Sequence, residues 1–378
     1  MPQSTLDANL IVNVGGLTGR SYLFMKQHSE YPHAIVLGCW LLACAVVVYA
    51  MVVVGGVTRL TQSGLSMVEW EPIMGIIPPL NTEQWMEVFN KYRQSPEYIK
   101  VNAGMSLDAF KSIFYWEYGH RVLGRIIGLI YFVPLAYFVL RGMVPKAWYA
   151  RLFGLFVLGG LQGLMGWYMV KSGLVDVPRV SQYRLTAHLS LAFVIYACMF
   201  WFAMDFLRGE HRHQRATNTY LTATTVVILV ISLMIISGGF VAGTKAGFIM
   251  NTFPKMAGQW VPPGLSAIDP AWRNLFENPV TIQFIHRCVA IAVLTVVLWG
   301  FLQARQQNFK TQYYWLKITV VAQVLLGIST LVMRVPVWLG ALHQAGAVML
   351  LSAALFAAHT ARKGRVEASR KRKREGLA

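Results

Sequence analysis

Long apolar runs alternate with polar segments along the whole chain. Each run approaches or exceeds about 20 residues, the length that an α-helix needs to cross roughly 30 Å of hydrocarbon. The pattern predicts eight membrane-spanning helices, at 34–56, 118–140, 148–170, 185–206, 220–243, 282–303, 313–333 and 337–359. No large soluble domain fits in the remaining segments, so we expect an all-α integral membrane protein.

Composition and charge support this class. Apolar residues fill 56% of the 378 positions and charged residues only 13%, as is typical of a polytopic membrane protein. With the amino terminus inside, the inner segments hold 19 Lys and Arg against 5 Asp and Glu, and the rest of the chain holds 15 against 11. This positive-inside bias is densest at 370–374. We therefore interpret the net charge of +18 as a topology and lipid-headgroup signal, with both termini cytoplasmic and no nucleic-acid partner.

The cysteines give no sign of a disulfide framework. Cys39, Cys44, Cys198 and Cys288 all fall within predicted spans, and no Cys-x-x-Cys metal or haem-attachment motif occurs. The first span follows 33 fairly polar residues without a small-residue cleavage site. It is therefore interpreted as a retained helix and not as a signal peptide.

The two halves of the chain repeat one pattern. The first span ends with Gly-Gly at 55–56 and the fifth with Gly-Gly at 238–239, and a long outer segment with tryptophans and a Pro-Pro pair follows each. Then come a helix with an early His-Arg pair, a helix with Gln and Gly at one spacing, and a helix with an early histidine. Because four crossings are an even number, the halves should share one orientation. We expect two tandem, pseudo-symmetric four-helix bundles at 34–206 and 220–359, with cytoplasmic segments at 1–33, 207–219 and 360–378.

Four histidines occupy matching places near the outer ends of these helices. They are His120 and His188 in the first half, and His286 and His343 in the second. A lone histidine in a membrane helix is more often hydrogen-bonded structure than a ligand, but four at equivalent positions indicate ligands. The residue one turn further along each helix is small, which would leave clearance for a flat macrocycle, although close helix packing also favours small residues. These residues are Gly124, Ala192, Ala290 and Ala347.

The ligand set favours haem over a bare metal ion. A zinc ion would need a third and a fourth ligand, and the sequence positions none for it. Two imidazoles from facing helices of a bundle are a common ligand set for haem iron. We therefore predict one haem site in each half. Arginines near the same helix ends are candidates to pair with haem propionates, or to reach lipid phosphates; they are Arg59, Arg121, Arg125, Arg184, Arg287 and Arg334.

An acidic residue distinguishes the two halves. Three residues before the first histidine, and so on the same helical face, the first half has Glu117 and the second has Gln283. Glutamine cannot exchange a proton at neutral pH, whereas a partly buried glutamate can be tuned towards a working pKa. The first half is therefore predicted to carry the chemistry, and the second to hold a fixed electron-transfer or structural haem.

These features resemble the haem A synthase family. The resemblance covers roughly residues 30–360 and rests on the motifs at 58–67 and 117–121, the order of the four histidines and the eight spans. It implies oxidation of the C8 methyl group of haem O, through a hydroxymethyl stage, to the formyl group of haem A, with water as the oxygen source. It also implies that His120 and His188 flank the substrate, that His286 and His343 ligate a resident haem b, and that Glu117 is the essential acid.

The lack of cysteines in the outer loops indicates which group of the family the chain resembles. The chain is similar to the group that lacks the outer-loop cysteine pair, found in proteobacteria and mitochondria. The expected location is a bacterial inner membrane, with the mitochondrial inner membrane as the alternative. Expected partners are haem O, haem O synthase, cytochrome oxidase assembly factors, lipid and an unidentified electron acceptor, and a homo-oligomer stays open.

Two other functions compete with this one. A b-type cytochrome would also use two bis-histidine haems to pass electrons from quinol to another acceptor. Electron transfer across the membrane needs haems on opposite sides, whereas all four histidines here are predicted at outer helix ends. A transporter would use the repeat for alternating access and a histidine network for proton coupling. It would be colourless when purified.

Overall fold

The computed structural model describes residues 32–69, 76–173, 179–208, 216–306 and 309–375. In these ranges eight helices are long and apolar enough to cross a membrane, which confirms the predicted all-α membrane fold. They are α2 (Ala34–Leu60), α5 (Leu107–Leu140), α6 (Tyr149–Gly173), α7 (Gln182–Leu207), α8 (Asn218–Thr244), α10 (Pro279–Arg305), α11 (Lys310–Val332) and α12 (Val337–Glu375). Apart from one isolated antiparallel bridge between Met256 and Gln259, the described residues form helices, turns and loops.

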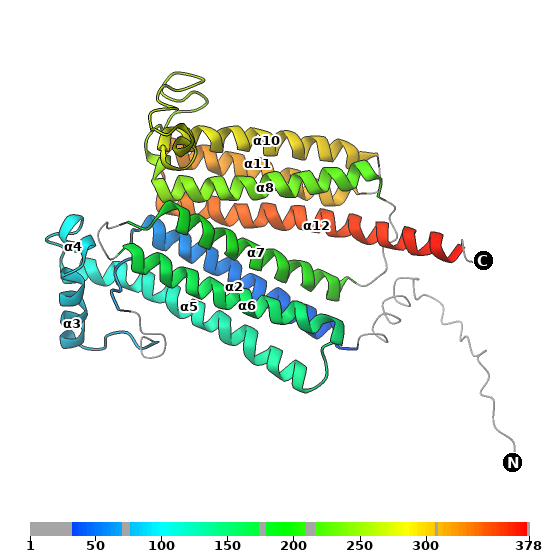
Figure 1. Ribbon diagram of the computed structural model, residues 1–378, viewed down its shortest axis with the longest axis horizontal. Helices are drawn as coiled ribbons and strands as arrows, with labels where there is room; N and C mark the ends of the chain where they lie inside the picture. Colours follow the sequence, from blue (N-terminus) through cyan, green and yellow to red (C-terminus); the bar gives the residue numbers. More distant parts are fainter. Residues whose placement is uncertain (1–31, 70–75, 174–178, 209–215, 307–308, 376–378) are drawn as a thin grey trace, which may run out of the picture.

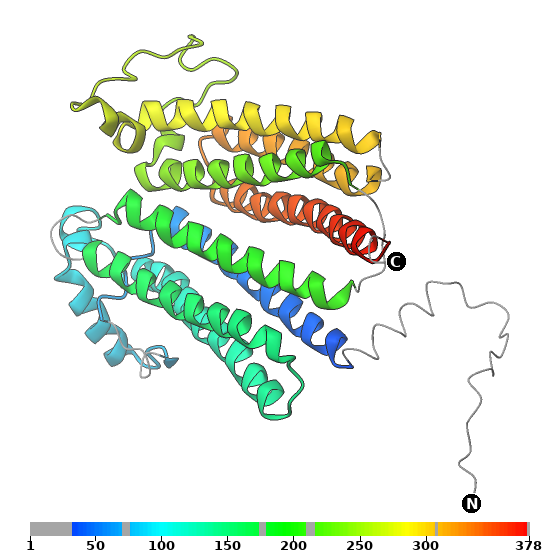
Figure 2. The same cartoon turned by 45° about the vertical axis from the view of Figure 1, so that its right-hand side comes forward.

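The eight spans lie as two groups of four, side by side (Figures 1 and 2). In the first group α2 packs against α5 and α7, and in the second α8 packs against α10 and α12. The groups meet where α2 contacts α12 and where α7 contacts α8. This arrangement is consistent with the predicted tandem bundles. The short helices α3 (Thr82–Arg93) and α4 (Pro96–Lys100) lie at the same end as the long segment after α8, opposite the end of α12 (Figure 1).

Two helices extend beyond their apolar runs. Helix α5 begins at Leu107 and not at 118, because Ser106 caps it by accepting a hydrogen bond from Ala109 N. Its first turns bury Phe110 and Phe114 against α3, so the apolar run identifies only the part of the helix that follows. Helix α12 continues to Glu375 and not to 359, because Lys, Arg and Glu after the apolar run are good helix formers. The predicted segments 1–33 and 207–219 fall largely outside the described residues.

The main core runs through both groups. Buried side chains from all eight spanning helices contribute to it, including Leu41, Tyr196, Ile231 and Val348. At the end of the helices opposite α3 and α4, His359 of α12 is 1% exposed, and its Nε2 lies 2.8 Å from Asp205 Oδ1 of α7. His359 is not one of the predicted site residues, but this contact joins the two groups of helices.

Candidate functional site

The four predicted histidines lie in two pairs, one in each group of helices. His120 of α5 lies near enough to His188 of α7 for their charges to interact, and the same holds for His286 of α10 and His343 of α12. Each pair thus brings together two helices that are separated in the sequence by a third. Within the described ranges, no three or more His, Cys, Asp or Glu side chains gather into a metal-binding group. Each pair therefore offers two imidazoles, the number that a haem iron takes as axial ligands.

Each imidazole lies against a glycine of a neighbouring helix. The contacts are Gly55 with His120, Gly166 with His188, Gly238 with His286 and Gly327 with His343. A Cβ atom at Gly327 would lie 2.9 Å from His343 Cε1, and one at Gly166 would lie 3.1 Å from His188 Cε1. Only glycine leaves room for so close an approach. The glycines of two of these contacts, Gly166 and Gly327, belong to the Gln and Gly pattern that α6 and α11 share. The contacts of Gly55 and Gly238 with histidines were not predicted.

The clearance expected one turn beyond His120 is partly filled. A Cβ atom at Gly124 would lie 3.3 Å from Met51 Cε of α2, so the Met51 side chain occupies the space beside this glycine. The sequence could not show this contact, because it depends on how α2 and α5 pack.

Glutamines from the preceding helix hold the second histidine of each pair. Gln162 Nε2 donates to His188 O at 3.1 Å and lies 3.3 Å from the ring Nε2, and Gln323 Nε2 donates to His343 O at 2.8 Å. Within the described part of the chain, His188 Nδ1 and His343 Nδ1 are buried without a hydrogen-bond partner. Buried polar atoms normally have partners. The unpartnered imidazole nitrogen in each pair fits a group bound between the two rings.

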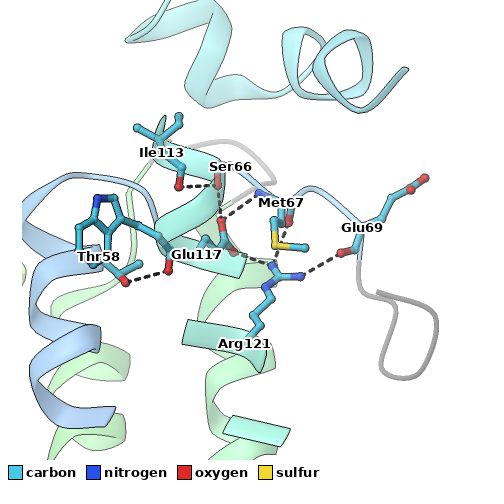
Figure 3. A network of polar contacts seen from close by, with 8 residues as sticks. Thr58, Ser66, Met67, Glu69, Ile113, Glu117 and Arg121 are labelled. Carbon is cyan, nitrogen blue, oxygen red and sulfur yellow. Dashed lines mark hydrogen bonds and ion pairs between the residues drawn. The ribbon is translucent and has the colours of Figure 1, made fainter. Parts of the chain in front are cut away.

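Glu117 lies in a polar network in the first part of α5 (Figure 3). Its carboxylate is 2% exposed and accepts hydrogen bonds from Ser66 Oγ at 2.8 Å and from Met67 N at 2.9 Å. Arg121 forms an ion pair with it at 2.6 Å and also donates to Met67 O and Glu69 O. Glu117 and Arg121 therefore hold the loop at 61–69 against the helix that carries His120. Sequence reasoning missed this anchoring, although Ser66 and Met67 lie within the motif at 58–67.

The second half holds its outer loop without a carboxylate. Gln283 Nε2 donates to Met250 O at 3.2 Å, and Arg287 donates to Met250 O and Thr252 O, each at 2.9 Å. An arginine thus binds loop carbonyls at the same place in both halves, whereas the acid occurs only in the first.

The other candidate arginines have different surroundings. Arg59 donates to Ala242 O at 3.0 Å, at the end of α8, where a cation also complements the helix dipole. Arg184 donates to Tyr168 OH at 3.1 Å, and Arg334 is exposed. Arg125 lies one turn further along α5 than Arg121. Propionate binding by any of these arginines, or by Arg121 and Arg287, stays a prediction.

A second buried acid lies near Glu117, in the segment between α2 and α5. Burial, together with the nearby charge of Glu117, raises the pKa of Glu97 in α4 from its ordinary value of 4.5 to about 7. Tyr92 OH donates to Glu97 Oε2 at 3.4 Å. No sequence pattern indicates this residue, because its burial comes from the packing of α3 and α4.

Eight membrane-spanning helices with two pairs of imidazoles, each ring packed against a glycine, define an integral membrane protein whose histidine pairs are candidate haem ligands. The chain belongs to the cytochrome oxidase assembly protein family COX15-CtaA, whose sequence model matches residues 38–355. It is 50% identical to the heme A synthase of Nitrosospira multiformis over 352 residues, covering 91% of this chain and 98% of the relative. It is 48% identical to the heme A synthase of Parvibaculum lavamentivorans over 327 residues, covering 86% and 94%.

Proposed function

We propose that the protein is a haem A synthase that oxidises the C8 methyl group of haem O to a formyl group. The observation that carries this proposal is 50% identity to a heme A synthase along 91% of the chain. Identity at this level along nearly the whole of both proteins favours a shared activity and not only a shared fold. The paired histidines add support, because they supply the ligands that a haem substrate and a haem cofactor require.

The two halves divide the work in this proposal. His120 and His188 would hold haem O, the substrate. His286 and His343 hold a resident haem b, which supplies a one-electron carrier when bound. Gly166 and Gly327 support the assignment by letting His188 and His343 lie flush against the neighbouring helix. Gln162 and Gln323 fix the backbone of the same two histidines.

Glu117 is the proton-handling residue of the first half. Oxidising a methyl group to a formyl group releases protons as well as electrons, and a carboxylate one turn from His120 is placed to take up a proton or to orient a water molecule. Its hydrogen bonds from Ser66 and Met67 hold the carboxylate in place and anchor the loop at 61–69. Arg121 balances its charge. Gln283 at the matching place cannot do this chemistry, which supports the second half as the resident-haem half.

The setting follows from the same proposal. The protein lies in a bacterial inner membrane with both termini in the cytoplasm, and both haem sites face the outer side. A haem O synthase supplies the substrate, cytochrome oxidase assembly receives the product, and a separate acceptor takes the electrons.

Pigment extraction tests the function directly. The full chain is produced in cells that make haem O but lack haem A, and extracted haems are separated before and after its induction. Haem A is expected only after induction, together with a low-spin haem spectrum in the purified protein. A low-spin spectrum with haem O alone would indicate a b-type cytochrome, and a colourless protein would indicate a transporter.

A further inference from the structure

One histidine of the second pair has a hydroxyl partner on its ring. Ser237 of α8 is 8% exposed, and its Oγ lies 2.8 Å from His286 Nδ1 of α10. The same Oγ lies 2.9 Å from Met234 O, the carbonyl one turn earlier in α8. Ser237 directly precedes Gly238, the glycine on which the His286 ring rests.

The hydrogen bonds define which ring nitrogen carries the proton. A serine hydroxyl has one proton, and a backbone carbonyl can only accept, so the proton of Ser237 goes to Met234 O. With its proton on Met234 O, Ser237 Oγ can accept from His286 when the imidazole proton is on Nδ1. In that tautomer the unprotonated nitrogen is Nε2, which is left to bind a metal. Metal-binding histidines commonly donate their other N–H to such a partner, which fixes the ring and increases its basicity.

The first half lacks this arrangement. The Gly-Gly pair at 55–56 matches the pair at 238–239, so the counterpart of Ser237 is Val54. Gly55 lies against the His120 ring as Gly238 lies against His286. A valine side chain has no atom that can accept a proton from Nδ1. The two halves therefore share the glycine contact but differ in the support of the imidazole.

We propose that Ser237 is a positioning residue that fixes His286 as a permanent ligand of the resident haem and lowers the reduction potential of that haem. The proposal rests on the assignment of the second half to the resident haem. By accepting from Nδ1–H, Ser237 makes the imidazole a stronger electron donor, which favours the ferric state. Val54 gives His120 no such support, which suits a ligand of a substrate that must enter and leave.

Redox titration of the purified full chain with its bound haem tests this inference. Ser237→Ala is expected to increase the equilibrium constant for reduction of the resident haem by about tenfold, an upward shift of about 59 mV for one electron. Ser237→Thr keeps a hydroxyl and is expected to stay near the native potential. Val54→Ala makes a comparable truncation at the matching place in the first half and is expected to leave this potential unchanged.

The outcomes separate this inference from the proposed function. An unchanged potential in Ser237→Ala, with the resident haem still bound, overturns the role of Ser237. It does not contradict the proposed haem A synthase function. A lower melting temperature with no shift in potential has the same meaning, because it reports packing alone. If Ser237→Ala does not fold, Ser237→Cys, whose sulfur is a weak acceptor, must shift the potential upward by a smaller amount. A native protein without any low-spin haem would instead refute the proposed function.

Discussion

Replacing Glu117 with glutamine separates chemistry from loop anchoring in the first half. The substitution keeps the size and shape of the side chain but removes its ability to take up a proton. We expect formation of haem A to fall by about 10²- to 10⁴-fold, the usual contribution of a positioned acid or base. The resident haem should stay bound, because Glu117 belongs to the other pair of helices.

The structure indicates that this variant will fold. Glutamine keeps an oxygen that can accept from Met67 N, and Arg121 keeps its bonds to Met67 O and Glu69 O. The substitution also breaks the buried ion pair with Arg121, which costs about 3–5 kcal/mol, still no more than the lower end of the usual net stability of about 5–15 kcal/mol. Gln283 provides a natural precedent, because it occupies the matching place and bonds to its own outer loop.

The assay measures extracted haem A, haem O and the low-spin spectrum in membranes that hold equal amounts of each variant. Ser66→Ala is the matched control, since it removes one loop hydrogen bond and leaves the acid in place. It should lower haem A formation by no more than about tenfold, the equivalent of one ordinary hydrogen bond. Equal losses in Ser66→Ala and Glu117→Gln would refute a proton-transfer role, and normal haem A in Glu117→Gln would exclude it outright.

Three other predictions follow from the same contacts. His286→Ala should remove the resident low-spin haem, whereas His120→Ala should abolish haem A but keep that spectrum; haem stoichiometry in the purified variants distinguishes them, and the reverse pattern would exchange the roles of the halves. Gly327→Ala should destabilise the protein by about 1–3 kcal/mol and lower its haem content, because the added Cβ would lie 2.9 Å from a ring atom of His343. In Gly238→Ala the added Cβ would lie 3.4 Å from a ring atom of His286, so melting temperature and haem content should fall less. Equal effects of the two variants would contradict the steric explanation. Because the folded state raises the pKa of Glu97 to about 7, stability should fall as pH rises from 4.5 to 7, by at most about 3 kcal/mol; melting curves should show this slope, and its persistence in Glu97→Gln would rule out Glu97 as its origin.

The membrane fold could be predicted because hydrocarbon imposes a minimum length of apolar sequence on every helix that crosses it. The same rule does not apply to helices outside the membrane. It therefore missed the start of α5 at Leu107, which depends on the Ser106 cap and on aromatic packing against α3. It also missed the continuation of α12 to Glu375, where charged residues form helix without an apolar run.

The candidate site was only partly accessible to sequence reasoning. The repeat was enough to pair the four histidines, since equivalent positions in repeated helices face equivalent neighbours. The partners of each side chain were not accessible, because they come from loops and helices whose approach depends on packing. Thus Glu117 was expected beside the substrate, but its bonds to Ser66 and Met67 and the burial of Glu97 became visible only in three dimensions.

The paired glycines near the ends of α2 and α8 contact both halves of the protein. The first of each pair lies against a histidine of its own half, whereas Gly56 lies against Gln344 and Gly239 against Thr186, both in the opposite half. Each Gly-Gly pair therefore serves a histidine of one half and the contact between the halves at the same time. A larger residue at Gly56 or Gly239 would disturb the histidine pairs and the interface between the halves together.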